Sequence, residues 1–256
     1  MINIIKKNLK ILDKKFFGEK LYRFSNERKL EKSSQQFQYS TTINYHKPTN
    51  AALAFGKLCE EHGSDKGYVS LRRDTPFASK PHTYSHLYTQ LFKDKADNIK
   101  KVFECGIGTN NPNIESNMTA TGKPGASLRV WKDFFKNAEI FGADIDKKIL
   151  FTEDRIKTFY VNQLDPNSIE KLWKSINENN FDIIVDDGLH TYDAALTLFQ
   201  KSFEFLKTGG YYIIEDIPTS FLEKLAYKLK DYNPHVVSFS DSIKIAYENN
   251  LIYIEK

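Results

Sequence analysis

Acidic pairs close two short apolar segments in the second half of the chain, and they limit the possible folds more than any other feature. Asp186 and Asp187 follow FDIIV, and Glu215 and Asp216 follow YYII. Carboxylates left unpaired beside a buried strand would take up protons or destabilise the fold by roughly several kcal/mol. We therefore expect both pairs at the open edge of a sheet, next to a cation.

Strand-like and helix-like segments alternate from about residue 100. Short apolar segments predict strands over residues 100–108, 138–146, 158–163, 181–188 and 210–217. Amphipathic segments predict helices between them, over residues 131–137, 168–178 and 194–207. The expected fold class is α/β, with a seven-stranded, mostly parallel sheet and helices on both faces. Asn249 and Asn250 are expected to turn between two antiparallel strands near the end of the chain.

The first 50 residues differ from the rest. Residues 1–36 hold ten Lys or Arg against four Asp or Glu, with apolar residues at roughly helical spacing, which predicts a basic amphipathic helix. It is expected to pack on its own domain or on a sister subunit of a homo-oligomer, or to contact an anionic membrane surface. Residues 32–50 are polar and predict a linker. The catalytic domain is expected over residues 51–256, beginning with a helical cap or lid over residues 51–96.

Charge and composition exclude several classes of protein. The net charge of +4 is concentrated in the N-terminal segment, which leaves about −2 for the remainder and argues against a nucleic-acid substrate. Two cysteines are too few for a disulfide framework. No apolar stretch is long enough to span a membrane, and the opening segment lacks the features of a signal peptide. A cytoplasmic protein acting on a small molecule is expected.

A cofactor signature follows the first two predicted strands. Glu104, Gly106 and Gly108 form E-C-G-I-G, in which glycines let the backbone approach a ligand closely. A plain turn or a dinucleotide enzyme would also use such a loop, although the third glycine of G-x-G-x-x-G is missing. Asp144 ends the second strand, where an acid can accept both hydroxyls of a ribose, and Asp146 is the less well placed candidate.

An amide pair closes the third predicted strand. Asn162 or Gln163 could read the edge of an adenine, and capping of a turn is an equal alternative for either one. Together with the glycine loop and Asp144, this pattern resembles the class I S-adenosylmethionine-dependent methyltransferases over residues 97–217. The resemblance implies a Rossmann-like fold, with Glu104, Gly106 and Gly108 as the methionine-side loop and Asp144 as the ribose acid. Asp186 is expected to belong to the same cofactor-binding set.

The two acidic pairs predict a metal site. If the strands that they follow are neighbours, their ends lie about 5 Å apart, so Asp187, Glu215 and Asp216 can converge on one ion. Oxygen ligands favour Mg²⁺, with Mn²⁺ or Ca²⁺ as alternatives. Adjacent side chains of a strand face opposite ways, so Glu215 and Asp216 can share an ion only where the backbone is irregular, as Pro218 suggests.

His190 is the predicted general base. It follows Asp187 by three residues, which places the acid on the metal and the imidazole on the substrate. A pKa of about 6.5 suits proton removal, and a capping or surface role is the alternative for this histidine. An alcohol is a poor nucleophile until a dication lowers its pKa and His190 takes its proton. The resulting alkoxide then displaces the methyl group from the sulfonium.

A closer resemblance covers residues 58–217. The motifs D-D-G-x-H, E-D, H-G-S-D-K-G at 62–67 and H-T-Y-S-H-L-Y at 82–88 resemble the metal-dependent sugar O-methyltransferases of macrolide antibiotic pathways. The resemblance implies that Asp187, Glu215 and Asp216 are metal ligands and that His190 is the base. It also implies that a segment folds over the cofactor or substrate. That segment contains Asp65, Lys66, His82, Tyr84 and Tyr88.

The expected function is transfer of a methyl group from S-adenosylmethionine to a sugar hydroxyl, in a nucleotide-linked sugar or a surface polysaccharide precursor. Leu189 departs from the usual small polar residue of the family, and the first 45 residues match no known pattern, so the substrate does not follow from the resemblance. The alternatives are an O-methyltransferase of a non-sugar small molecule, an NAD(P)-dependent oxidoreductase and a catalytically silent nucleotide-binding protein.

Overall fold

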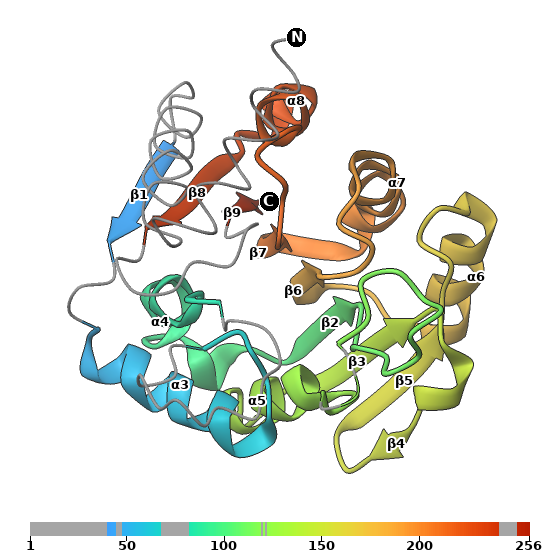
Figure 1. Cartoon of the computed structure of the whole chain (residues 1–256), viewed down its shortest axis with the longest axis horizontal. Helices are drawn as coiled ribbons and strands as arrows, with labels where there is room; N and C mark the ends of the chain where they lie inside the picture. Colours follow the sequence, from blue (N-terminus) through green and yellow to red (C-terminus); the bar gives the residue numbers. More distant parts are fainter. Residues whose placement is uncertain (1–39, 45–47, 68–81, 119, 121, 241–249) are drawn as a thin grey trace, which may run out of the picture.

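The computed structural model describes residues 40–44, 48–67, 82–118, 120, 122–240 and 250–256. The helix predicted within residues 1–36 lies outside this part of the chain. The strands are β1 (Ser40–Asn44), β2 (Lys101–Cys105), β3 (Glu139–Asp144), β4 (Thr152–Glu153), β5 (Ile156–Tyr160), β6 (Phe181–Asp186), β7 (Leu206–Ile214), β8 (His235–Ser240) and β9 (Asn250–Glu255). They form one sheet in the order β1-β8-β9-β7-β6-β2-β3-β5-β4 (Figure 1).

The sheet confirms the predicted α/β class. Parallel pairing joins β5, β3, β2, β6 and β7, whereas β9 runs antiparallel to both β7 and β8. β2, β3, β5, β6 and β7 are the five strands expected up to residue 217. β8 and β9 are antiparallel, but the expected turn residue Asn249 lies outside the described part of the chain. The sheet is wider than expected because β1 extends one edge, parallel to β8, and β4 extends the other, antiparallel to β5.

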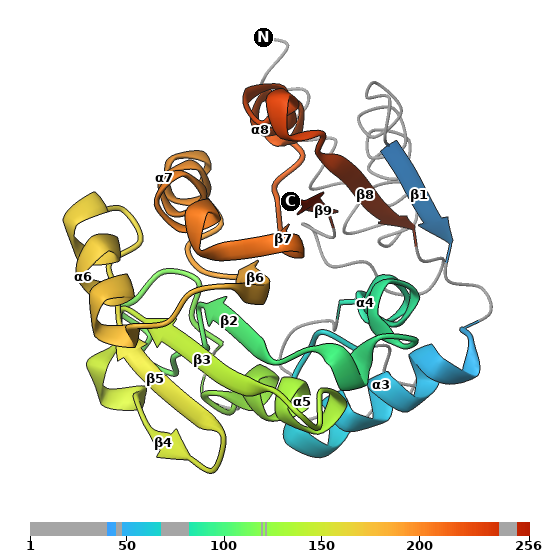
Figure 2. The same cartoon turned by 180° about the vertical axis from the view of Figure 1, so that it is seen from behind.

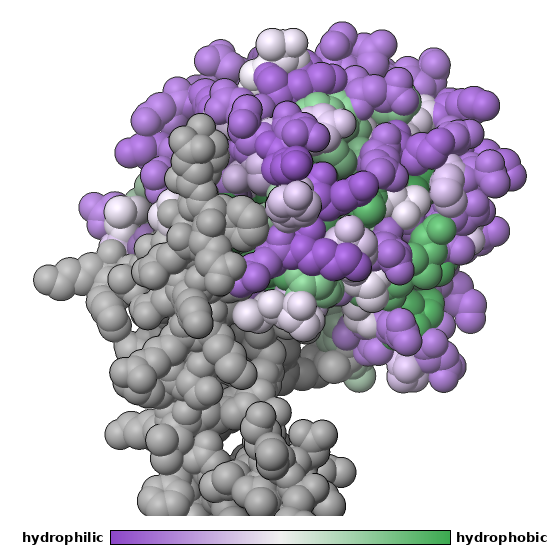
Figure 3. All heavy atoms as spheres, turned by 90° about the horizontal axis from the view of Figure 1, so that it is seen from above, coloured by the Kyte–Doolittle hydropathy of each residue, from purple (hydrophilic) through white to green (hydrophobic). Residues whose placement is uncertain are grey.

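Helices cover both faces of the sheet (Figures 1 and 2). On one face lie α3 (Asn50–His62), α4 (Ser85–Phe92) and α5 (Ala126–Phe134), and on the other lie α6 (Pro166–Ile176), α7 (Tyr192–Ser202) and α8 (Leu222–Lys228). Hydrophilic side chains dominate the face in Figure 3, with smaller apolar groups between them. None of the helices in the described part of the chain is long and apolar enough to cross a bilayer.

Helix α6 shows how local sequence sets these elements. The Asp165 side chain accepts a hydrogen bond from the backbone N–H of Asn167, and Pro166 occupies the first turn, where its missing N–H is harmless. Apolar residues recur every three or four positions and face the sheet. Asn177 then ends the helix in the left-handed conformation. The buried apolar residues of this helix are Ile169, Leu172, Trp173 and Ile176.

The helices predicted as a cap are part of the core. Thr49 caps α3 by accepting from the Ala52 N–H at 3.1 Å, and Gly63 ends the helix at φ 83°. Phe55 of α3 and Tyr88 of α4 are buried against Trp131 of α5. Helices α3 and α4 therefore belong to the layer that covers one face of the sheet.

Two predictions near the sheet edge were wrong. Residues 40–44, predicted as part of a linker, form β1, because Thr and Ile favour extended backbone and an edge strand needs only one partner. Asn250, predicted as a turn residue, is the buried first residue of β9. Its side chain accepts from the Ser238 hydroxyl at 2.8 Å and donates to the Ile217 carbonyl at 2.9 Å, which ties β8 and β9 to the end of β7.

The strand order reverses between β2 and β6. From β2 the chain continues to β3 and β5 on one side, and β6 continues to β7 on the other. Ligands of open α/β sheets bind at the carboxyl ends of the strands beside such a switch point. The ends of β2 and β6 are tied together there, because the Asp187 N–H donates to the Cys105 carbonyl at 2.9 Å.

Candidate active site

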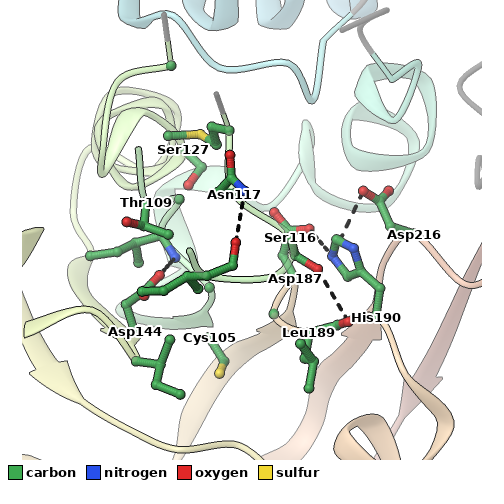
Figure 4. Close-up of a pocket in the computed structure, with 18 of the residues that line it drawn as sticks. Cys105, Thr109, Ser116, Asn117, Ser127, Asp144, Asp187, Leu189, His190 and Asp216 are labelled. Atoms are coloured by element: carbon green, nitrogen blue, oxygen red, sulfur yellow. Dashed lines mark hydrogen bonds and ion pairs between the residues drawn. The ribbon is translucent and has the colours of Figure 1, made fainter. Parts of the chain in front are cut away.

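A cavity of about 540 Å³ opens at the carboxyl ends of β2, β3, β6 and β7 (Figure 4). Its walls come from the loops that follow these strands, from the loops after β5 and α3, and from the start of α5. Figure 4 shows Thr109 and Asp144 at one end and Asp187, His190 and Asp216 at the other. The volume falls within the range of about 300–1,000 Å³ that small-molecule sites occupy. One cavity therefore joins the predicted cofactor end to the predicted catalytic end.

The loop after β2 requires glycine at positions 106 and 108, because its backbone lies very close to other parts of the protein. Gly106 adopts φ 85°, its N–H donates to the Ala143 carbonyl at 2.8 Å, and a Cβ on it would overlap the backbone carbonyl of Asp187. Gly108 adopts φ 80°, and a Cβ there would overlap the side chain of Met118. Both glycines thus permit a backbone that L side chains rarely adopt. The loop can lie against both β6 and a ligand.

Asp144 lies where a ribose acid is expected. It lines the cavity and accepts the Ile107 and Asp146 N–H groups at 2.9 Å each, one on each carboxylate oxygen. Burial raises the pKa of Asp144, and these backbone N–H groups oppose the rise. Asp146 is engaged elsewhere, because its carboxylate accepts from the Thr109 hydroxyl at 2.6 Å. The geometry favours Asp144 over Asp146 for a ribose, as the sequence did.

The amide pair after β5 is used within the protein. Asn162 lines the cavity, and its side-chain oxygen accepts from the Leu164 N–H at 3.1 Å, which is the turn-capping alternative. Gln163 also lines the cavity, but its amide donates to Asp186 at 2.6 Å and accepts from the Leu189 N–H at 2.9 Å. Burial raises the pKa of Asp186 to about 6 against the opposing effects of His190 and Gln163.

A buried ammonium lies among the acids. Lys66 Nζ is 3.2 Å from Glu104 and forms close ion pairs with Asp187 and Glu215, and its side chain is 2% exposed. Burial would lower the pKa of Lys66, but Asp187, Glu215 and Glu104 together raise it well above its usual value. Glu104 is held further by Trp131 Nε1, which donates to it at 2.6 Å. Lys66 therefore supplies the cation that buried carboxylates need.

The loop after α3 forms part of the cavity wall. Asp65 and Lys66 line the cavity, as does His82, whose N–H donates to the Asp65 carbonyl at 2.7 Å. Burial raises the pKa of Asp65, and the charge of His82 opposes this rise. Of the segment that was expected to fold over the cofactor or substrate, Asp65, Lys66 and His82 therefore line the cavity.

Tyr84 and Tyr88 do not fold over the cavity; they support the acids from the core. They lie one turn apart at the start of α4, a spacing that places both on its buried face. The Tyr84 hydroxyl donates to the Asp216 carboxylate and accepts from the Asp216 N–H at 3.2 Å. The Tyr88 hydroxyl donates to Glu215. Contact of Tyr84 with the cofactor stays a prediction, and in this arrangement its side chain is buried and its hydroxyl is paired with Asp216.

His190 joins the acids that follow β6 and β7. Its Nε2 lies 3.2 Å from Asp187 and 3.9 Å from Asp216 (Figure 4). Burial alone would lower the pKa of His190, but the hydrogen bond to Asp187 and the charges of Asp216 and Asp187 raise it to about 10. For Asp187, burial would raise the pKa, and the charges of Lys66 and His190 bring it well below its usual value. The pair is therefore ionised at neutral pH.

Three side chains have the spacing of a metal site. Ligand atoms of Asp187, His190 and Asp216 lie within 4.8 Å of one another. Asp216 adopts φ 53°, which is the irregular backbone expected after β7, so it faces His190 while Glu215 faces Lys66 and Tyr88. The structure thus brings two of the three predicted ligands together. Glu215 stays a predicted ligand, and its carboxylate is engaged by Lys66.

Relatives of the chain share one kind of chemistry. No protein-family model matches it. It is 34% identical over 164 residues to the 8-demethyl-8-alpha-L-rhamnosyl tetracenomycin-C 2'-O-methyltransferase of Streptomyces olivaceus, covering 64% of this chain and 38% of the relative. It is 32% identical over 174 residues to the mycinamicin VI 2''-O-methyltransferase of Micromonospora griseorubida, covering 68% of this chain and 40% of the relative.

Solved structures show the fold. The MycE methyltransferase from the mycinamycin biosynthetic pathway, in complex with Mg and SAH, superposes with a TM-score of 0.56 at 24% identity, covering 79% of this chain and 54% of that chain. The chain has the class I methyltransferase fold and is related to the sugar O-methyltransferases of antibiotic pathways. It spans about two fifths of the length of the curated relatives that it matches.

Several contacts of this site were not predicted from the sequence. The ion pairs of Lys66, the Trp131 contact to Glu104 and the Gln163 clamp on Asp186 all join residues far apart in the chain. A lysine after a helix-ending glycine carries no signal of burial. Asp187, Glu215 and Asp216 could be predicted as site residues because they follow apolar strands.

Proposed function

We propose that this protein transfers a methyl group from S-adenosylmethionine to a sugar hydroxyl with the aid of a divalent metal ion. The observation that carries the proposal is the single cavity, which has the glycine loop and Asp144 at one end and Asp187, His190 and Asp216 at the other. The names of the curated relatives, all of them O-methyltransferases, support the reaction type.

The residues at the cofactor end fit an adenosyl ligand. Asp144 keeps a lone pair on each carboxylate oxygen beyond the two backbone hydrogen bonds, so it can accept from ribose hydroxyls. Gly106 and Gly108 leave backbone close to the cavity without a Cβ. Ile145 and Leu164, which are 46% and 51% exposed and line the cavity, offer apolar surface for a base.

The donor set at the other end fits a hard divalent cation. Asp187 and Asp216 supply carboxylate oxygens, which Mg²⁺, Mn²⁺ and Ca²⁺ prefer, and His190 lies within reach of the same point. We propose that Asp187 and Asp216 hold the ion, with Glu215 as the third predicted ligand. A dication at this place would lower the pKa of an acceptor hydroxyl.

His190 would take the proton of the acceptor hydroxyl. Its imidazole is oriented by Asp187 at 3.2 Å and carries a pKa of about 10 in the arrangement described. An imidazolium cannot accept a proton, so His190 can act as a base only in its neutral form. Positive charge near Asp187 and Asp216 would lower the pKa of His190 and so favour that form. Holding the hydroxyl in line with the methyl group then contributes through orientation.

The acceptor is proposed from the relatives. One acts, by its name, on a rhamnosyl tetracenomycin and another on L-olivosyl-oleandolide, so we propose a sugar attached to a small molecule. The nucleotide-linked sugar or polysaccharide precursor expected from the sequence remains a prediction, as do the cytoplasmic location and the homo-oligomer. An NAD(P)-dependent oxidoreductase would leave the acids around His190 without a role.

The proposal is tested with S-adenosylmethionine labelled on its methyl group. Methyl α-L-rhamnoside and dTDP-rhamnose serve as acceptors, and calorimetry compares the binding of S-adenosylmethionine and NAD. We expect S-adenosylmethionine binding, label in the sugar, and a loss of at least tenfold in rate after chelation that Mg²⁺ restores. Full activity in excess chelator would refute the metal requirement, and NAD binding without S-adenosylmethionine binding would refute the reaction.

A further inference from the structure

Gln163 forms a two-ended clamp on the loop between β6 and α7. Its side chain is buried, with 6% of the residue exposed. The amide nitrogen donates to Asp186 Oδ1 at 2.6 Å, and the amide oxygen accepts from the Leu189 N–H at 2.9 Å. Gln163 lies in the loop after β5, so the two hydrogen bonds join the ends of two strands that are not neighbours in the sheet.

The clamped loop carries the two residues nearest to the proposed chemistry. Asp186 and Leu189 enclose Asp187 and Gly188, and His190 follows directly. The fit is close, because a Cβ on Gly188 would overlap the amide oxygen of Gln163.

His190 adopts φ 55°, a left-handed conformation that costs a non-glycine residue about 1 kcal/mol or more and persists only when its surroundings hold it. The Leu189 N–H that donates to Gln163 belongs to the residue immediately before this strained position. Gln163 therefore restrains the backbone that sets the direction of the imidazole.

We infer that Gln163 is a positioning residue that holds Asp187 and His190 in place for methyl transfer. The inference rests on the proposed function, since it concerns the same reaction. Each polar end of the Gln163 amide is held by one hydrogen bond within the protein, Nε2 to Asp186 and Oε1 to the Leu189 N–H. Both partners of Gln163 belong to the loop that carries Asp187 and His190, so Gln163 acts on these two residues through the loop.

The test replaces Gln163 with Met, which keeps the length of the side chain and removes both hydrogen bonds. We expect kcat with methyl α-L-rhamnoside to fall 10- to 100-fold, while the Kd for S-adenosylmethionine stays within threefold. Hydrogen exchange of the Leu189 amide should be at least tenfold faster, with the amides of Ile183, Ile184 and Val185 unchanged. Glu170→Gln, which alters the exposed ion pair between Glu170 of α6 and Lys201 of α7, is the matched control and should change none of these values.

Opposite outcomes separate the possible roles. A tenfold weaker Kd for S-adenosylmethionine with unchanged kcat would assign Gln163 to the adenine and overturn the inference, as would unchanged exchange at Leu189. If Gln163→Met does not fold, Gln163→Glu, which keeps the acceptor and loses the donor to Asp186, is measured in the same way. Wild-type protein that binds S-adenosylmethionine but methylates no sugar would refute the proposed function, whereas exchange at Leu189 would still report on the clamp.

Discussion

The ammonium of Lys66 lies 3.2 Å from the carboxylate of Glu104, and this ion pair connects the end of β2 to the acids after β6 and β7. Lys66 also pairs with Asp187 and Glu215, so one buried cation faces three carboxylates that come from three strands. The attraction between these charges offsets their removal from water only while all partners are present. Lys66 is thus central to the stability of the site.

Lys66→Met should therefore destabilise the protein. Removing one partner leaves buried carboxylates without a counter-charge, which costs about 3–5 kcal/mol. Urea unfolding in the presence of chelator measures the loss. Lys57→Met is the control, because the Lys57 side chain is 76% exposed and its pair with Glu61 at 3.8 Å should contribute less than about 0.5 kcal/mol. Equal stability of Lys66→Met and wild type would show that the acids do not depend on Lys66.

Asp187→Asn and Asp216→Asn should each weaken binding of Mg²⁺. Loss of one charged oxygen ligand is expected to raise the Kd at least tenfold, which corresponds to about 1.4 kcal/mol. Calorimetric titration with MgCl₂ measures this without any acceptor. Asp193→Asn, on an exposed acid in the first turn of α7, should bind Mg²⁺ as wild type does. Unchanged binding in both site variants would place the ion elsewhere or exclude it.

The central part of the sheet could be predicted because each of its strands is recognisable from its own short stretch of sequence. The five parallel strands β2, β3, β5, β6 and β7 are short apolar segments, and the helices between them have regular apolar spacing. The edges were not predictable in this way. Residues 40–44 are mostly polar in sequence, although they pair in parallel with β8. Asn250 has the residue type of a turn, and its role becomes clear only from its partners Ser238 and Ile217.

The site was predictable to the level of its acids and its histidine. Asp144, Asp187 and Asp216 could be found because an acid directly after an apolar strand is unusual. Their place at one edge of the sheet follows from the parallel arrangement of β3, β6 and β7. The direction of each side chain was not predictable. Glu215 faces Lys66 and Asp216 faces His190 because the backbone turns left-handed at Asp216. Pro218 predicted an irregular backbone there but not which acid would face which partner.

The stability contributed by His190 should depend on pH. Folding raises the pKa of His190 from about 6.5 to about 10, so its contribution is complete below pH 6.5 and is lost as the pH rises towards 10. Asp187, whose pKa is lowered, stays ionised throughout this window. In chelator, wild type should be about 1.5–3 kcal/mol more stable than His190→Asn at pH 6. The difference should shrink at pH 10, as urea unfolding at both values will show, and a constant difference would contradict the raised pKa.

Gly106→Ala should damage the fold far more than Gly209→Ala. Both glycines have positive φ, 85° and 72°, so alanine at either site carries the same backbone cost of about 1–2 kcal/mol. A Cβ at Gly209 meets nothing within 4 Å, whereas one at Gly106 overlaps the carbonyl of Asp187 and forces β2 and β6 apart at the cavity. We expect Gly106→Ala to lose a further 1–3 kcal/mol, roughly, and at least tenfold in S-adenosylmethionine affinity. Thermal unfolding and calorimetry measure the two effects, and equal behaviour of the two variants would mean that the contact between Gly106 and Asp187 is not tight.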